Sequence, residues 1–255
     1  MEISFKDYIV LVTGAASGMG LETSRQFINN GAVVVALDYS EKNLEKAARE
    51  LGDKYIAKFC DISSEKSIIE IAQYVKDAHG RLDCLINNAG RVRFGIAFET
   101  MKEEDFYWHY DVIVKGPMLL CKHLIPLLRK SSHASIVNIT STVTEQEISN
   151  HFMYSTAKTA MQKFTRHLAR DLPGIRANSI LPGWTDTPMG ESIGSREQVE
   201  AVFKMLLPRI PCRRVAQPID IANCVLFLCS DKASYITGAA VAVDGGFMVA
   251  PDWGV

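Results

Sequence analysis

The sequence predicts an α/β protein, a doubly wound parallel sheet with helices on both faces. Short, continuously apolar segments alternate with helical patterns along nearly all of its 255 residues. Apolar strands without a polar alternation are typical of parallel sheets buried on both sides. No linker, repeat or low-complexity tract interrupts the alternation, so we expect residues 1–255 to form a single domain.

The expected elements follow from local patterns. Strands are predicted at 8–14, 32–38, 55–61, 82–90, 134–141, 175–183 and 239–246. Helices are predicted at 18–30, 41–52 and 64–80, around Tyr154, and over 103–130, where Gly116, Pro117 and Pro126 interrupt the pattern. The stretch 189–213 is polar at its start and contains prolines further on, and it interrupts the alternation of strands and helices. An excursion of this length indicates a substrate-binding loop or lid.

Composition excludes several classes of function. The formal net charge of −1 does not favour nucleic acid or an anionic membrane as a partner. Apolar runs such as "AVVVAL" are far shorter than the ~20 residues of a membrane span, and the start shows no signal-peptide pattern. We therefore expect a cytoplasmic protein.

Cysteine and histidine patterns do not indicate disulfides or a metal site. No CxxC pair occurs, and the histidines lack metal-ligand spacing. The cysteines stand mostly among apolar residues, as expected for buried thiols: Cys60, Cys84, Cys121, Cys212, Cys224 and Cys229.

A glycine-rich stretch, "VTGAASGMG", follows the first predicted strand. Gly14, Gly18 and Gly20 allow the backbone to approach a ligand, and the helix that starts there favours negative charge. Their spacing, Gly-x-x-x-Gly-x-Gly, differs from the more familiar Gly-x-Gly-x-x-Gly, and glycine turns also arise for steric reasons alone. The strand before it and the helix after it favour a pyrophosphate site.

Asp38 ends the second predicted strand, 18 residues after Gly20. An acidic residue there accepts hydrogen bonds from the adenosine ribose and repels a 2′-phosphate. No lysine or arginine occurs in "GAASGMG" or "DYSE" to bind such a phosphate. The alternative is a solvated aspartate at a strand end, but beside the glycine loop the pattern favours NAD over NADP.

With these motifs in place, the chain resembles the short-chain dehydrogenase/reductase family over essentially its whole length. The motifs "TGAASGMG", "CDIS", "NNAG", Ser141 with "YSTAK", "LPGWTDTPM" and "VDGG" occur in family order and spacing. The resemblance implies a Rossmann-like domain, often a homotetramer, that moves hydride between a nicotinamide and a carbonyl or alcohol. It implies further cofactor contacts at Ser17, Met19, Asp61, Ile62, Asn88, Ala89, Gly90, Pro182, Gly183, Thr185 and Thr187. For Asn87 and Asn88, the alternative is a turn whose side chains bond the backbone.

The candidate catalytic residues are Ser141, Tyr154 and Lys158. Tyr154 and Lys158 are four residues apart and share one helix face. An ammonium about 4 Å from a phenol contributes roughly 4 kcal/mol at an effective dielectric of 20, or about three pKa units. Such a shift brings the tyrosine toward the range of general acid–base catalysis.

By resemblance, Ser141 binds the substrate oxygen, and Lys158 also holds the cofactor's nicotinamide ribose. A helix with an ordinary buried stripe is the alternative. The stripe explains the helix but not the three residues together; it comprises Ala157, Ala160, Met161, Phe164 and Leu168.

One residue departs from the family pattern. Ile113 stands where family members usually carry an asparagine that helps hold a proton-relay water, and isoleucine makes no hydrogen bond. Asp111 is two residues away and faces elsewhere on a regular helix. A nicotinamide-binding regulator or scaffold with lost turnover is therefore a rival hypothesis. A second rival hypothesis is a carrier-protein-linked acyl reductase. Such enzymes usually prefer NADP, and Asp38 disfavours NADP.

Substrate signals are few. Segment 144–151 lies between Ser141 and Tyr154, where the family lines its pocket, and it is unusually polar at Glu145, Gln146, Asn150 and His151. Arg91 and Arg93 follow "NNAG" and are candidates for the pocket entrance, but for each of these residues a solvated loop position is the more common case. Steroids, polyols and cyclic alcohols remain open. The sequence thus predicts an NAD-dependent oxidoreductase that interconverts a secondary alcohol and a ketone, with Tyr154 as general acid/base.

Overall fold

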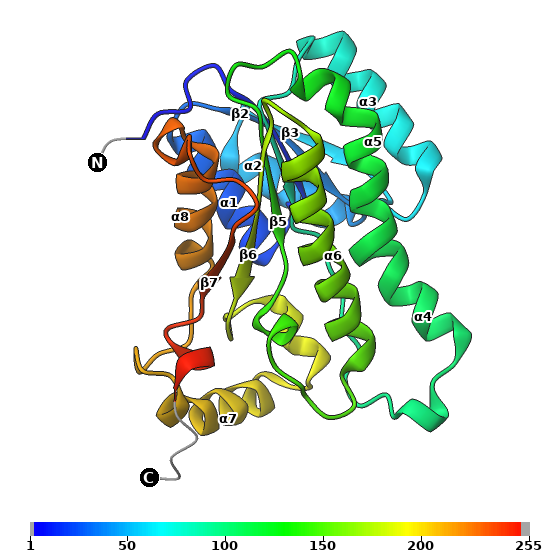
Figure 1. Ribbon diagram of the computed structural model, residues 1–255, viewed down its shortest axis with the longest axis vertical. Coiled ribbons are helices and arrows are strands. Elements are labelled where there is room, and N and C mark those ends of the chain that lie inside the picture. Colours follow the sequence, from blue (N-terminus) through cyan, green and yellow to red (C-terminus); the bar gives the residue numbers. More distant parts are fainter. Residues whose placement is uncertain (1–2, 251–255) are drawn as a thin grey trace.

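The computed structural model describes residues 3–250 and shows one seven-stranded parallel sheet between two layers of helices (Figure 1). The strand order is β3-β2-β1-β4-β5-β6-β7. The strands are β1 Ile9–Thr13, β2 Val33–Asp38, β3 Tyr55–Phe59, β4 Cys84–Asn87, β5 Ser135–Ile139, β6 Arg176–Pro182 and β7 Ala240–Val243. The predicted Rossmann-like, doubly wound fold is confirmed; residues 1–2 and 251–255 of the predicted 1–255 domain lie outside the described residues.

Two sets of helices cover the sheet (Figure 1). On one face lie α1 Gly18–Asn29, α2 Glu41–Leu51 and α8 Pro218–Cys229; on the other lie α3 Glu65–His79, α5 Gly116–Leu128 and α6 Phe152–Asp171. Two further helices are α4 Glu103–Tyr110 and α7 Arg196–Leu206. The helix α8 is not among the elements that the sequence pattern predicts, and α7 lies inside the predicted loop at 189–213.

Side-chain alternation along β1 explains why both faces are covered. Val10 and Val12 pack toward α1 and α8, whereas Ile9 and Leu11 pack toward α3 and α5. All of β1 is buried. Each fully buried aliphatic side chain contributes roughly 1.5–3 kcal/mol, so a strand that is apolar on both sides is stable only between two layers.

The predicted helix over 103–130 is divided in two. A π-helical turn, Asp111–Lys115, separates α4 from α5. Lys115 Nζ contacts Asp111 Oδ1 at 2.6 Å across this turn, so both side chains point away from the core. The next residue, Gly116, has no room for a side chain, because a Cβ there would lie 2.7 Å from the carbonyl oxygen of Ile62. The turn directs Ile113 inward, where it is 2% exposed.

The strand order reverses between β1 and β4, and hydrogen bonds join the two loops that follow these strands. Thr13 Oγ1 accepts from the backbone N–H groups of Asn88 and Ala89 at 3.0 and 2.9 Å. The Asn88 amide donates to the carbonyl oxygens of Thr13 and Gly14 at 2.9 and 3.2 Å. Open α/β sheets bind their ligands in the crevice at such a reversal.

Candidate active site

Two adjoining cavities open at this edge of the sheet. One, the cleft, follows β1, β2 and β4; of the predicted site residues it is lined by Gly14, Ser17, Gly18, Met19, Asp38, Asp61, Ile62, Asn88, Ala89, Gly90 and Thr187. The other, the pocket, is lined by Ser141, Tyr154, Lys158, Pro182, Gly183 and Thr185. Met19, Asn88, Val92, Thr187 and Met189 line both, so the two cavities are continuous.

Gly20 is the one predicted site residue that lines neither cavity. A Cβ at this position would lie 2.1 Å from the Gly14 carbonyl oxygen and 2.5 Å from the Asn88 side-chain nitrogen. The absence of a side chain therefore lets α1 pack against the loop after β1. Asn88 fits the turn-forming alternative, because its amide is used within the protein, although it also lines both cavities.

The cleft fits a phosphate-bearing cofactor at the start of α1. Ser17 precedes this helix with φ −156° and makes no side-chain cap hydrogen bond. By contrast, Ser40 and Ser64 cap α2 and α3. The first N–H groups of a helix lack intrahelical partners and favour an anion, so the start of α1 is suited to a pyrophosphate.

Asp38 is fixed in the wall of the cleft. Its carboxylate accepts hydrogen bonds from Ala16 N at 3.1 Å and Ser40 N at 3.0 Å. Lys46, from the exposed side of α2, lines the same cleft. Sequence reasoning missed this lysine because it considered only the residues adjacent to Asp38 and the glycine loop, and α2 returns to the cleft only in the folded chain.

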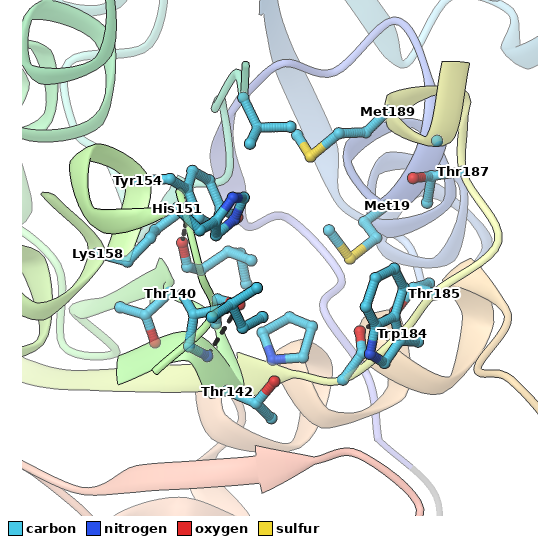
Figure 2. Close-up of a pocket in the computed structure, with 18 of the residues that line it drawn as sticks. Met19, Thr140, Thr142, His151, Tyr154, Lys158, Trp184, Thr185, Thr187 and Met189 are labelled. Atoms are coloured by element: carbon cyan, nitrogen blue, oxygen red, sulfur yellow. Dashed lines mark hydrogen bonds between the residues drawn. The ribbon is translucent and has the colours of Figure 1, made fainter. Parts of the chain in front are cut away.

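The three candidate catalytic residues come together in the pocket. Ser141 follows β5, and α6 carries Tyr154 and Lys158 side by side (Figure 2). Tyr154 is 9% exposed and Lys158 3% exposed. Lys158 Nζ donates to the Ile139 carbonyl at 2.8 Å and lies 5.5 Å from the centre of the Tyr154 ring.

Burial controls the acidity of this pair. It raises the pKa of Tyr154 to about 12, against an opposing effect of the hydrogen bond with Ser141. It lowers the pKa of Lys158 to about 8. The predicted lowering of the Tyr154 pKa by Lys158 is therefore wrong for this structure, because removal from water disfavours both charged forms and Ile139 already accepts a hydrogen bond from the ammonium.

Ile113 packs directly into this site. It belongs to a small apolar cluster with Val92, Tyr154, Ala157 and Met161. Asp111, the nearest carboxylate in sequence, is paired with Lys115. At this position the wall behind Tyr154 is therefore hydrocarbon, and it offers no polar atom for a proton relay.

The pocket is less polar than segment 144–151 suggests. Gln146, Ile148 and His151 line it, whereas Glu145 accepts a hydrogen bond from Gln162 and Asn150 is not part of the lining. Most of the remaining wall is apolar, with Val92, Phe94, Trp184, Met189, Ile193, Phe203 and Phe247. Three of these residues fall in 189–213, which supports a binding role; closure as a lid stays a prediction.

The two arginines after "NNAG" are held elsewhere. The guanidinium carbons of Arg91 and Arg93 lie 4.5 and 4.4 Å from the centre of a Trp108 ring, and Arg93 pairs with Asp105 at 2.9 Å. Arg91 lines the cleft, and neither arginine lines the pocket. Neither arginine therefore contributes to the pocket wall, because both pack on Trp108. A position at the substrate entrance stays a prediction.

Neither a metal-binding cluster nor a membrane-spanning helix occurs among residues 3–250. Within residues 3–250, His, Cys, Asp and Glu side chains form no group of three or more that would hold a metal ion. In the same range, none of the helices is long and apolar enough to cross a membrane.

Comparison with known proteins identifies the family of the chain. Residues 14–248 match the family model described as enoyl-(acyl carrier protein) reductase. A 3-oxoacyl-[acyl-carrier-protein] reductase of Thermotoga maritima is 34% identical over 246 residues, which is 94% of this chain and 98% of that protein.

Two solved structures extend the similarity to three dimensions. Aldohexose dehydrogenase of Thermoplasma acidophilum superimposes with a TM-score of 0.91 at 28% identity, covering 100% of this chain and 99% of that one. The 3-ketoacyl-(acyl-carrier-protein) reductase of Brucella melitensis, complexed with NADH, gives 0.87 at 31% identity, covering 96% and 100%. The chain therefore belongs to the short-chain dehydrogenase/reductase family of oxidoreductases, which bind a nicotinamide cofactor.

Proposed function

We propose that this protein is an NAD-dependent oxidoreductase that interconverts a secondary alcohol and a ketone. The observation that carries the proposal is the convergence of Ser141, Tyr154 and Lys158 in a pocket continuous with the cleft at the start of α1. A binding protein needs the cleft alone. The pocket adds a hydroxyl, a phenol and an amine to the wall where a substrate would meet the cofactor.

Each of the three side chains has a distinct role in the proposed reaction. The nicotinamide, when bound, exchanges hydride with the substrate carbon. The Ser141 hydroxyl donates a hydrogen bond to the substrate oxygen, and the Tyr154 phenol exchanges the proton with that oxygen. Lys158 keeps one proton on the Ile139 carbonyl and has two further N–H donors for the cofactor's ribose. The apolar wall excludes water and strengthens these contacts.

Asp38 supports NAD as the cofactor. Its carboxylate is held in the cleft wall by two backbone N–H groups, so it does not readily turn away from a 2′-phosphate. The related Brucella reductase was solved with NADH. Lys46 and Arg91 also line the cleft and favour a phosphate, so the cofactor preference depends on the balance between these cations and Asp38.

The decisive test is turnover. The purified protein is incubated with NAD and a panel of secondary alcohols that includes steroids, polyols and cyclic alcohols, and NADH absorbance is followed. We expect at least one alcohol to be oxidised, and the Tyr154→Phe variant to be nearly inactive on it. The proposal would be contradicted if the protein bound NAD but neither oxidised any of the alcohols with NAD nor reduced any of the corresponding ketones with NADH.

Reduction of 3-oxoacyl thioesters is a second candidate, favoured by the similarity to the Thermotoga reductase. Acetoacetyl-coenzyme A serves as the probe, with NADPH and NADH compared. Rapid NADPH oxidation with this thioester, together with inactivity on the alcohols, would replace the first proposal. Asp38 leads us to expect the opposite outcome.

We also propose a cytoplasmic homotetramer, on the strength of the family resemblance. The surface of α4 and α5 supports assembly, because large apolar side chains there are exposed: Phe106, Tyr107 and Met118. Exposed apolar side chains that lie close together mark interaction surfaces more often than isolated ones do.

A further inference from the structure

His151 is a buried polar residue that the catalytic proposal does not use. It immediately precedes α6 and lines the pocket beside Tyr154, with its ring 5% exposed (Figure 2). The ring lies between two aromatic neighbours. Its centre is 5.0 Å from that of Tyr154 and 4.7 Å from that of Phe94, on which it is stacked. The position of the imidazole is therefore fixed by packing.

This fixed imidazole lacks a protein partner. Nδ1 of His151 is enclosed within the protein, and in the range 3–250 neither ring nitrogen hydrogen-bonds another residue. Nε2 is the nitrogen that is not enclosed, so it is the one that a ligand in the pocket can reach. The buried His109 provides a contrast, because its Nδ1 bonds the Asp105 carbonyl at 2.8 Å and its Nε2 accepts from Arg93 N at 3.3 Å. A buried polar group without a partner costs stability, so an unpaired nitrogen that is open to the pocket indicates a ligand that supplies the partner.

The charge state of the imidazole limits which ligand group fits. Burial, together with the neighbouring His109, lowers the pKa of His151 to about 4. The ring is thus neutral near pH 7, with one donor and one acceptor nitrogen. A neutral ring stacked on Phe94, in a pocket that is also lined by Ile148 and Trp184, suits an uncharged hydroxyl or carbonyl rather than a carboxylate or phosphate.

We propose that His151 hydrogen-bonds a second oxygen of the substrate, on the carbon next to the one that reacts. The substrate class is then a vicinal diol or α-hydroxy ketone whose remaining part is apolar. The 5.0 Å between the centres of the His151 and Tyr154 rings supports this position, because side chains this close together would bind neighbouring parts of one molecule. This inference rests on the proposed function, because it takes Tyr154 as the group that meets the reacting oxygen.

A matched pair of alcohols tests the inference. With NAD, 1-phenyl-1,2-propanediol is compared with 1-phenyl-1-propanol, which lacks only the second hydroxyl. We expect kcat/KM to be at least tenfold higher for the diol. In His151→Phe, which keeps an aromatic ring against Phe94 but removes both nitrogens, the diol should lose at least tenfold and the mono-alcohol about twofold or less. The control His167→Phe, on the exposed side of the same helix, should change neither value.

Binding separates the two proposals. Calorimetric titration of 2-hydroxy-1-phenylpropan-1-one and 1-phenylpropan-1-one, with and without NADH, measures the same preference without turnover. If the unmodified protein turns over neither these alcohols nor any other alcohol or ketone of the panel, but binds the hydroxy ketone tenfold tighter in a His151-dependent way, the proposed function fails and the His151 contact stands. Equal binding of both ketones, or a preference retained in His151→Phe, would overturn the inference. His151→Leu takes the place of His151→Phe if the latter does not fold.

Discussion

At the scale of single residues, Tyr154 and Lys158 show a conflict between stability and chemistry. Burial disfavours the charged form of each, so the phenol ionises less readily and the amine loses its proton more readily than in water. Both side chains are nevertheless enclosed beside Ser141. The cost is understandable if the site gains from being dry, because hydrogen bonds to a developing negative charge are stronger there.

The first prediction isolates the Tyr154 hydroxyl. Tyr154→Phe removes this oxygen and keeps the ring that packs on Ile113 and His151. Turnover should fall by ~10² or more while NAD affinity persists, because proton transfer is lost and the cleft is intact. Steady-state kinetics and cofactor titration measure the two effects. Lys158→Met should lower both turnover and NAD affinity. A Tyr154→Phe variant that retained most of the activity would disprove the proton-transfer role of Tyr154.

The second prediction concerns Asp38. NAD should bind at least tenfold tighter than NADP, since desolvated like charges commonly cost more than ~1.4 kcal/mol. Asp38→Ala should reduce the difference between the NAD and NADP affinities, because it removes the charge that repels the 2′-phosphate. Lys46→Ala should increase this difference, because it removes a positive charge that attracts the 2′-phosphate. Titration of each variant with both cofactors measures the difference. Equal affinity of the unmodified protein for NAD and NADP would refute the cofactor assignment.

The third prediction uses the burial of His151. Its folded pKa is about 4, below the usual 6.5, so between these values the unfolded chain binds more protons. Stability is therefore fully present above pH 6.5 and falls as the pH falls toward 4. Between pH 7 and pH 5 the unmodified protein should lose about 2 kcal/mol relative to His151→Phe. Urea unfolding at several pH values measures this; parallel curves for the two proteins would contradict it.

At the scale of elements, the π-helical turn between α4 and α5 matters most for the site. The sequence identified Ile113 as the departure from the family and placed it in a helix. It did not reveal the turn, because Gly116 and Pro117 indicate an interruption without specifying the extra residue per turn. The turn pairs Asp111 with Lys115 on the outside and presses Ile113 against Tyr154.

The fourth prediction tests this contact. Ile113→Asn replaces a buried hydrocarbon by an amide without partners, so the free energy of unfolding should fall by roughly 2–4 kcal/mol. Turnover should change by tenfold or less, about 1.4 kcal/mol of barrier, because Ser141, Tyr154 and Lys158 stay in place. Denaturant unfolding and steady-state kinetics measure the two effects. An inactive native protein that gained turnover by orders of magnitude in Ile113→Asn would instead favour the nicotinamide-binding regulator.

At the scale of the whole molecule, the features that contiguous residues encode could be predicted from the sequence, whereas those assembled from distant residues could not. Most strands are largely apolar within their own few residues, and the glycine loop and "YSTAK" are contiguous. The fold, the cleft and Tyr154 with Lys158 could therefore be predicted. The pocket wall joins Phe94, Ile193, Phe203 and Phe247, which lie far apart in the chain. The orientation of His151 likewise depends on Phe94, so no local pattern gives the pocket's apolar character.

The last prediction concerns assembly of whole chains. Tyr107 is 52% exposed on α4 and Met118 is 39% exposed on α5. If both side chains are buried between copies of the chain, light scattering after size exclusion should give about four times the mass of one chain. The double variant Tyr107→Glu/Met118→Glu should give a smaller species, because burying two carboxylates between copies is costly. Met205→Glu, at a methionine that is 68% exposed on α7, is the control and should keep the full mass. A native protein that runs as a monomer, or a double variant of unchanged mass, would exclude this face as the contact.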